Sequence, residues 1–365
     1  MKRIHIAVLI IVAICVVTIG TTFGILIFTT WGAIDYENTY YYEPTSPSSI
    51  ERININSDIG SILINYNQTP TDYYAKVDLK IHIEGILVEG SSFSDFFHPI
   101  SWANESTPIT TLTVDAKATT WFIFGVFRQV QINLTLRTDV VYDLNILSST
   151  GGINMNVPDN VIVNNTTLRT STGSIFLNAG KNNLFQGDVE LSTSTGSVAL
   201  TAKDVNFIHN LRAFTSTGSM TFNFSKCSIG GHFTGTVSTG SIGFNSYNMK
   251  YAEGYTWRLE SSTGSIGINI LQYTEMGANI NGSLVTSTGS INVYYRDNLA
   301  NIGAKFTCST STGSNSYTPI GSGGFSESGA NPKIITSNDY NTATNTYTFT
   351  GMTSTGSTNV QAESL

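Results

Sequence analysis

The sequence predicts an all-β chain that folds as a single-stranded parallel β-helix solenoid, with one N-terminal transmembrane helix before it. Two observations predict the β-helix. A Ser/Thr-Ser-Thr-Gly-Ser-apolar motif returns at a nearly constant interval, and apolar residues alternate with polar residues after each copy. A third observation, an almost unbroken apolar run near the N-terminus, predicts the membrane segment.

The motif repeats at the spacing of a solenoid. Its glycines follow one another at intervals of 22, 23, 22, 22, 24, 25, 24 and 43 residues, and the last interval is close to two units with one motif missing. The motif glycines are Gly151, Gly173, Gly196, Gly218, Gly240, Gly264, Gly289, Gly313 and Gly356. A fixed period of about 20–50 residues is typical of arrays in which each unit buries its apolar face against its neighbours.

Alignment on the glycine shows which positions face the core. The second and fourth residues after it are mostly aliphatic or aromatic, with mostly polar residues between them, which is the period of a strand with one buried face. The parity changes at the glycine, so Thr-Gly-Ser is predicted to be a corner where a Cβ would be penalised. We expect the hydroxyl residues three and one before the glycine to point inward and to bond to one another or to corner backbone groups.

A polar column follows each corner. Eight residues after the glycine stand Asp159, Lys181, Asp204, Lys226, Asn248, Gln272 and Asp297. Stacked at about 4.8 Å, these side chains would place opposite or neutral groups side by side along the rod. We interpret this column as a solvated edge and not as a binding patch.

The N-terminus predicts a membrane anchor. Lys2 and Arg3 precede the apolar run of residues 6–28, whose length matches a hydrocarbon core of about 30 Å. We predict that residues 1–32 are a retained transmembrane anchor with a short cytoplasmic tail, since a signal peptide usually has a shorter apolar region. The positive flank predicts a cell-membrane protein with a cytoplasmic N-terminus and an extracytoplasmic β-helix. Residues 33–50 are then a membrane-proximal stalk.

The rest of the chain is predicted to be one β-helix. Residues 151–365 hold the regular repeat, and residues 51–150 are interpreted as its irregular first turns. Within these turns, residues 90–127 form an aromatic insert that ends in the apolar run 121–127. We interpret that run as a buried strand or an end cap, and the alternative is an aromatic wedge that rests on the membrane or on a partner.

The first half carries a family resemblance. The degenerate corner Ile59-Gly60-Ser61-Ile62, and the run from Leu136 to Ile146 that leads into the Ser-Ser-Thr-Gly repeats, are similar to the putative adhesin family of β-helices, often called the toastrack domain. The resemblance covers residues 51–365. It implies a right-handed, single-stranded β-helix that is frequently attached to membrane segments. It implies no catalytic residues that map onto this chain, and the insert 90–127 departs from the family pattern.

Motifs for catalysis, cofactors and metals are not found in the sequence. The five histidines are scattered without metal-ligand spacing, and no serine lies in a Gly-x-Ser-x-Gly elbow. The mixed, slightly acidic charge shows no basic stretch, which argues against a nucleic-acid partner. We therefore predict no enzymatic activity, cofactor or metal. Candidate N-glycosylation sites are Asn67, Asn104, Asn133, Asn164, Asn165, Asn223 and Asn281.

These observations favour a non-catalytic, membrane-anchored surface protein that is adhesin-like or structural. The alternatives are an envelope or membrane-stress sensor module and, less favoured, a polysaccharide-active β-helix enzyme, which would need paired carboxylates or a calcium site. The expected partners are the membrane, through residues 6–28, and a surface protein or a glycan. The repeat decays after residue 315, so we expect either an irregular loop that caps the end or an open edge that pairs with a second molecule.

Overall fold

The computed structural model describes residues 16–18, 21, 31–44, 48–69, 71–86, 88, 90–104, 109–117, 127–299, 301–321 and 324–364. Nearly all of the predicted membrane segment 6–28 lies outside these residues, and so does the stretch 118–126 of the aromatic insert. Within the described part of the chain, no helix is long and apolar enough to cross a bilayer. The anchor and the orientation of the chain stay predictions.

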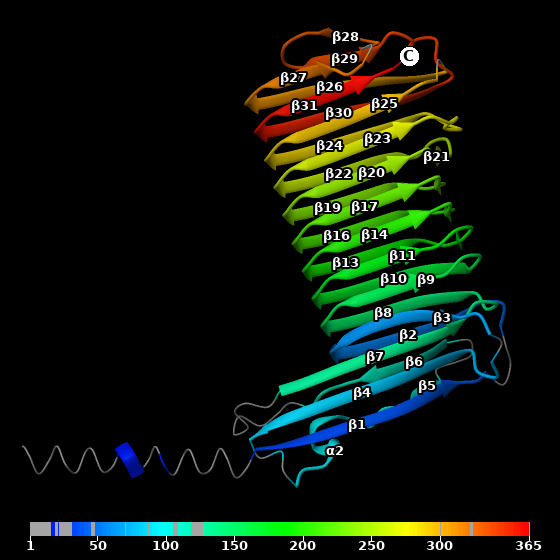
Figure 1. Cartoon of the computed structure of the whole chain (residues 1–365), viewed down its shortest axis with the longest axis vertical. Coiled ribbons are helices and arrows are strands. Elements are labelled where there is room, and N and C mark those ends of the chain that lie inside the picture. The colour runs from blue at the N-terminus through cyan, green and yellow to red at the C-terminus, as the bar shows by residue number, and fades with distance from the viewer. Residues whose placement is uncertain are drawn as a thin grey trace, which may run out of the picture.

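The chain winds into a rod of stacked rungs, so the predicted all-β solenoid of parallel strands is confirmed (Figure 1). Each regular rung has three sides. Face A carries the strand that follows a motif glycine, and face B carries the strand that leads to the next glycine. Face C lies between them and carries a two-residue strand in four successive rungs. Equivalent positions stack in register: Leu191, for example, pairs with Leu168 on one side and with Ala213 on the other. The right-handed winding implied by the family resemblance stays a prediction.

The strands of each face follow one another along the rod. Face A, in spatial order, consists of β1 (Trp31–Tyr42), β4 (Ala75–Ile86), β7 (Phe127–Arg137), β3 (Ser61–Asn67), β9 (Ile153–Val157), β11 (Ile175–Ala179), β14 (Val198–Lys203), β17 (Met220–Ser225), β20 (Ile242–Tyr247), β23 (Ile266–Gln272), β25 (Ile291–Asp297), β31 (Thr358–Glu363) and β27 (Asn315–Pro319). Face C consists of β12 (Leu184–Phe185), β15 (Asn206–Phe207), β18 (Ser228–Ile229) and β21 (Lys250–Tyr251), beside the start of β10.

Face B lies on the other side of the core from face A. In spatial order it consists of β5 (Trp102–Asn104), β6 (Ile109–Val114), β2 (Glu51–Ile59), β8 (Tyr142–Thr150), β10 (Ile162–Thr172), β13 (Val189–Thr195), β16 (Leu211–Thr217), β19 (Phe233–Thr239), β22 (Thr256–Thr263), β24 (Ile280–Thr288), β30 (Asn345–Thr355), β26 (Ile302–Thr312), β29 (Lys333–Ser337) and β28 (Phe325–Ser328).

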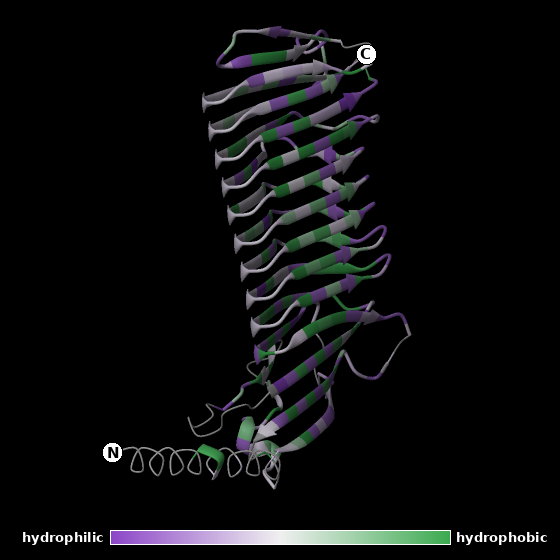
Figure 2. Ribbon diagram, turned by 60° about the vertical axis from the view of Figure 1, so that its left-hand side comes forward, coloured by the Kyte–Doolittle hydropathy of each residue, from purple (hydrophilic) through white to green (hydrophobic). Residues whose placement is uncertain are grey.

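The core fills the space between the three faces. Ile175, Ile242 and Ile291, all two residues after a motif glycine, are at most 1% exposed, as the alternation predicts. Hydrophobic and hydrophilic residues alternate along the strands in Figure 2. Aromatic rings stack from rung to rung; the centroids of Phe185 and Phe207, for example, lie 5.0 Å apart. Each fully buried side chain of this size stabilises the fold by about 1.5–3 kcal/mol.

The N-terminal end differs from the predicted stalk and irregular turns. Residues 31–42, expected within or beside the stalk 33–50, form β1, which pairs antiparallel with β4 along its full length. β4 also pairs antiparallel with β7, so three long strands extend face A beyond the rungs (Figure 1). β2 and β3 form a true rung, since Gly60 stacks on Gly151. Alternating apolar residues along β1 and β4 are equally compatible with antiparallel pairing, which motif counting does not detect.

The described part of the aromatic insert is packed against the rod. The four-residue helix α2 (Phe93–Phe96) buries Phe96, and Phe97 is buried beside it. The ring of Phe93 stacks on Tyr36 of β1 with centroids 3.9 Å apart. These residues pack at the N-terminal end of the rod. The apolar run 121–126 lies outside the described residues, so the aromatic-wedge alternative is not addressed there.

The C-terminal end is closed by the chain itself. The last rung, formed by β30 and β31, lies between the rung of β24 and β25 and the rung of β26 and β27. The hairpin of β28 and β29 then pairs antiparallel with β26. The end is therefore covered by a hairpin, and the final residues of the chain are an internal rung instead of an edge (Figure 1).

Candidate functional site

The motif glycines form a structural column at one corner of the rod. Their φ angles lie between +135° and +146°, a region that L side chains rarely adopt. A Cβ on any of the nine would lie 1.9 to 2.2 Å from the carbonyl oxygen of the glycine in the adjacent rung. Along the rod the column runs Gly60, Gly151, Gly173, Gly196, Gly218, Gly240, Gly264, Gly289, Gly356 and Gly313. The motif is thus required for stacking.

The hydroxyl residues of the motif divide into an inward and an outward set. The hydroxyl residues that stand three positions before a motif glycine point inward. Each donates a hydrogen bond to the carbonyl oxygen of a glycine in the adjacent rung, at 2.8 to 3.3 Å. The donors are Ser148, Thr170, Thr193, Thr215, Ser261, Thr286, Thr310 and Thr353. The threonines directly before the glycine are exposed, so the inward orientation predicted for them is wrong. Both residues directly before each motif glycine are exposed, so the alternation of inward and outward side chains already changes before the glycine.

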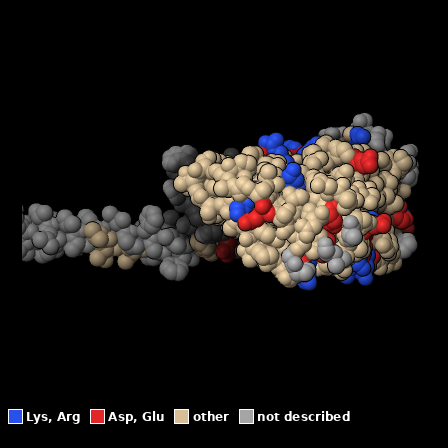
Figure 3. All heavy atoms as spheres, turned by 90° about the horizontal axis from the view of Figure 1, so that it is seen from above, with Lys and Arg blue, Asp and Glu red and all other residues tan. Residues whose placement is uncertain are grey.

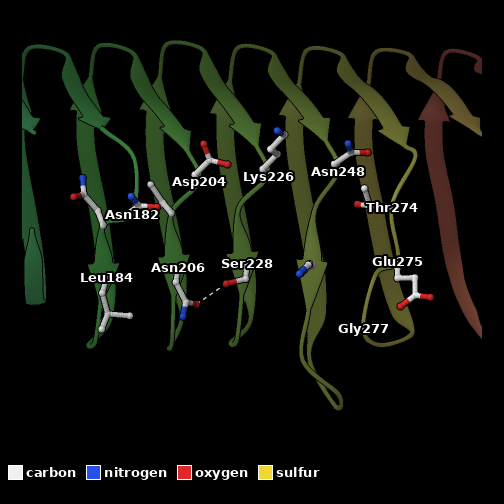
Figure 4. A pocket seen from close by; sticks show the side chains of 13 residues that line it. Asn182, Leu184, Asp204, Asn206, Lys226, Ser228, Asn248, Thr274, Glu275 and Gly277 are labelled. Atoms are coloured by element: carbon white, nitrogen blue, oxygen red, sulfur yellow. Dashed lines mark hydrogen bonds between the residues drawn. The ribbon is translucent and has the colours of Figure 1, made fainter. Parts of the chain in front are cut away.

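A groove runs along face C (Figure 4). It has a volume of about 1000 Å³, is open to solvent, and crosses successive rungs. One row of side chains comes from the turn between face A and face C, and a second row comes from the short strands. The first row is Asn182, Asp204, Lys226, Asn248 and Thr274, and the second row is Leu184, Asn206, Ser228 and Lys250. Glu275 adds a carboxylate from the loop that follows β23.

A left-handed turn places the first row at the corner between face A and face C, where Asn182 and Lys226 are exposed and Asn248 is 8% exposed. Asn182, Asp204, Lys226 and Asn248 have φ angles of +51° to +57°, a conformation that Asn and Asp tolerate best. In this conformation the backbone bends at a single residue as it passes from face A to face C. The amides also bind neighbouring rungs: Asn248 Oδ1 accepts a hydrogen bond from the backbone N–H of Tyr273 at 2.7 Å. The turn therefore fixes the spacing of the row at the spacing of the rungs.

The groove holds charges of both signs that are available to a ligand. Among the described residues, no oppositely charged group lies within 4.0 Å of Asp204, Lys226, Lys250 or Glu275. Ser228 Oγ donates to Asn206 Oδ1 at 2.5 Å, which leaves the amide N–H groups of Asn206 as donors. The rungs form ion pairs elsewhere, on face B between Arg169 and Glu190 and on face A between Arg296 and Glu363. The other charges are scattered in Figure 3.

Longer rungs bound one end of the groove. The intervals of 24 and 25 residues after Gly240 and Gly264 add loop residues around Gly254 and Gly277, both with positive φ. The loop at Thr274–Gly277 lies at the end of the groove in Figure 4. Tyr247 precedes Asn248 of the groove, and Tyr273 precedes Thr274. The rings of the two tyrosines pack edge to face with centroids 6.0 Å apart. The irregular intervals were the signal in the sequence that could have indicated this site.

The prediction of a solvated edge is correct for only part of the polar column. Asp204, Lys226 and Asn248 of this column line the groove. Asn248, Gln272 and Asp297 are only 8%, 0% and 3% exposed, so the prediction of a solvated edge is wrong for them. Gln272 bonds to the backbone of Met249 and to the hydroxyl of Tyr347. Burial raises the pKa of Asp297 to about 6, and the charge of Asp339 adds to the shift.

The candidate glycosylation sites are scattered over the rod. Asn281 is exposed on face B, and Asn67 is partly exposed at the end of β3. Asn133 and Asn223 lie within strands of face A. The side-chain amides of Asn164 and Asn165 donate to Asp143 at 2.7 and 3.1 Å, and Asn104 ends β5. The structure therefore brings only Asn164 and Asn165 together. Glycosylation of these seven residues stays a prediction.

Within the described residues, no group of three or more His, Cys, Asp and Glu side chains is arranged to hold a metal ion. Chemical recognition in the groove would therefore rest on amides, hydroxyls and single charges. These groups bind polar ligands by hydrogen bonds, with Asn supplying both donors and acceptors. The site resembles a binding surface shaped for a long ligand that lies across several rungs.

Comparison with known proteins gives fold-level similarity only. No family model matches the chain, and no curated protein matches it by sequence. One similar solved structure is a putative cell adhesion protein from Clostridium sporogenes, 12% identical, with 90% of this chain and 100% of that chain covered and a TM-score of 0.23. Another is a putative adhesin from Bacteroides fragilis, 10% identical, with 91% and 97% covered and a TM-score of 0.35. At these values neither assigns a function to this chain.

Proposed function

We propose that this chain is a non-catalytic, adhesin-like surface rod that binds an extended glycan along the groove of face C. The observation that carries the proposal is the groove itself, which repeats a row of polar side chains across successive rungs. A small molecule would use one or two rungs, whereas a polymer would contact all of them. Membrane attachment through residues 6–28 is part of the proposal, because it would display the rod outside the cell.

The spacing of the acids supports binding over catalysis. Asp204 and Glu275 belong to rungs three apart, which places them roughly 14 Å apart at the strand spacing of about 4.8 Å. The two carboxylates of glycosidases are about 5–9.5 Å apart. Lys226 and Lys250 lie in the rungs between these acids. The sensor and enzyme alternatives stay predictions.

The direct test is a glycan array probed with the full-length chain. We expect binding to one class of polysaccharide, with weaker binding to its short fragments, because a fragment spans fewer rungs. The double variant Lys226→Ala, Lys250→Ala should bind about tenfold more weakly or worse, since charge-assisted hydrogen bonds contribute about 1.5–3 kcal/mol each.

Arg258→Ala is the matched control, because it removes a positive charge from face B, away from the groove. It should bind as the unaltered chain does. If the groove variant and the control bind equally well, the groove is not the glycan site. If no glycan is bound at all, the proposed function fails.

A further inference from the structure

The C-terminal rung is out of sequence order. β24 pairs with β30, and β30 pairs with β26, although β26 comes before β30 in the chain. On face A, β31 likewise separates β25 from β27. The chain thus passes over one rung position, builds the top rung and the hairpin, and returns to fill the gap with residues 345–364. We call this gap the slot.

The slot selects a strand of this chain's own type. Gly289 N–H donates to Thr355 O, and Gly356 N–H donates to Thr312 O, both at 2.9 Å. Thr353 Oγ1 donates to Gly289 O from inside the slot. A Cβ at position 356 would lie 2.0 Å from Gly289 O, so the occupant needs glycine at this corner. A segment that carries the Ser-Thr-Gly motif in the right register therefore fits.

The occupant packs loosely beside its corner. Gly351 takes the place that Leu191 and Leu284 have in other rungs, and Thr358 takes the place of an isoleucine or valine. A small cavity of about 10 Å³, at the lower limit for one water molecule, lies at this junction. It is lined by residues of the slot and of the occupant, among them Ile291 and Phe306. The looser packing is confined to this junction, because Tyr347 and Phe349 of the same rung are buried in the core.

The connection to the rung is long enough for exchange. Residues 338–344 join β29 to β30 and are half-buried or exposed. Seven residues span at most about 24 Å when extended. The slot lies one rung, or about 4.8 Å, below the top rung. The extended connection can therefore reach the slot of a second rod whose end faces the first.

We propose that a second copy of this chain is a partner, and that two rods join end to end by exchanging residues 345–364. Each slot would receive the same hydrogen bonds and side-chain contacts from the second copy as from its own chain. Only the connection 338–344 would change, so the balance between monomer and dimer depends on concentration and on this segment. The proposal is independent of glycan binding, because the groove lies in earlier rungs.

The test is a disulfide that forms only after exchange. Ser283 and Thr350 are direct partners on neighbouring parallel strands, at a spacing within the disulfide range. Full-length Ser283→Cys and full-length Thr350→Cys, with different tags, are mixed at high concentration and oxidised. We expect a heterodimer on non-reducing gels. Gly351→Ala in the Thr350→Cys chain should slow its formation by about two- to fivefold, because it strengthens the occupied slot.

The control uses the same geometry in an interior rung. Arg258 and Ser283 are also direct partners, so a mixture of Arg258→Cys and Ser283→Cys chains reports random surface oxidation. A single chain with both Ser283→Cys and Thr350→Cys should form an internal disulfide, which shows that the pair can react. If this internal bond forms but the mixture gives no more heterodimer than the control, exchange does not occur. Glycan binding by the internally bonded chain would leave the proposed function intact.

Discussion

The interior rungs, residues 151–297, and the C-terminal end, residues 302–364, share one corner chemistry but differ in packing. In both regions the glycines stack with the same φ and the same close approach to a carbonyl oxygen. The interior position of Gly235 is filled by its neighbours Leu259 and Phe222, whereas Gly351 and Thr358 line a small cavity at the end. The corner glycine therefore determines whether a rung can stack, and the core residues determine how firmly the rung is held.

The largest effect is expected from a charge in the interior core. Ile242 is 1% exposed between Met220 and Ile266, so Ile242→Asp should destabilise the fold by about 4 kcal/mol or more. The outward Asn245→Asp in the same strand should change stability by less than about 0.5 kcal/mol. Urea unfolding of both variants measures the difference. Equal losses would contradict the assignment of inward and outward positions.

The next effect concerns the corner. Gly218→Ala would place a Cβ 2.0 Å from Gly196 O at a φ of +141°, so we expect a loss of about 3 kcal/mol from strain and displacement of the backbone. Gly243→Ala in the next rung is the control, because its Cβ would have only one neighbour, at 3.8 Å. Thermal unfolding should separate the two variants clearly. A harmless Gly218→Ala would show that the corner does not require glycine.

A pH effect should appear at the C-terminal end. Burial raises the pKa of Asp297 to about 6, whereas the unfolded value is about 3.9. Protonated Asp297 thus favours the folded state, and stability should fall by about 2–3 kcal/mol as the pH rises from 4 through 6. Ser364, at the end of the inserted rung, donates to Asp297 Oδ1 at 3.1 Å, so that rung is in direct contact with the carboxyl group whose buried charge destabilises the fold.

The variant Asp297→Asn isolates this contribution from those of other titrating groups. Between pH 4 and pH 7 the stability of the unaltered chain should decline relative to that of the variant. Hydrogen exchange of residues 345–364 at the two pH values shows whether the inserted rung is the part that opens. An identical pH profile for both chains would remove Asp297 as the cause.

The smallest effect should have the opposite sign. Gly351 has an ordinary φ, and a Cβ there would meet its nearest neighbour, Ile291 Cδ1, at 3.7 Å, which is normal contact. Gly351→Ala should therefore stabilise the chain by about 0.4–1 kcal/mol. Gly282→Ala, in the adjacent rung, should destabilise it, because its Cβ would lie 2.1 Å from the ring of Phe349. Destabilisation by both would mean that the inserted rung is already well packed.

Only part of the candidate site could be predicted from the sequence. The residues Asp204, Lys226 and Asn248 could be recognised as a column, because a constant period aligns them. Their grouping with Lys250 and Glu275 into a groove depends on how the chain turns between faces A and C, which involves left-handed residues of several types. Lys226 is not a residue whose type predicts such a turn. The depth of the groove was therefore not visible in the sequence.

The sequence by itself determined the solenoid, its period, the inward positions such as Ile242 and the corner glycines, because these follow from local alternation and from steric limits on single residues. Only the tertiary structure decided the order of the rungs at the C-terminal end and the pairing of β1 with β4. The physical reason is that all rungs carry the same corner motif, so local chemistry accepts more than one neighbour. The choice is made by core packing and by the reach of the connections.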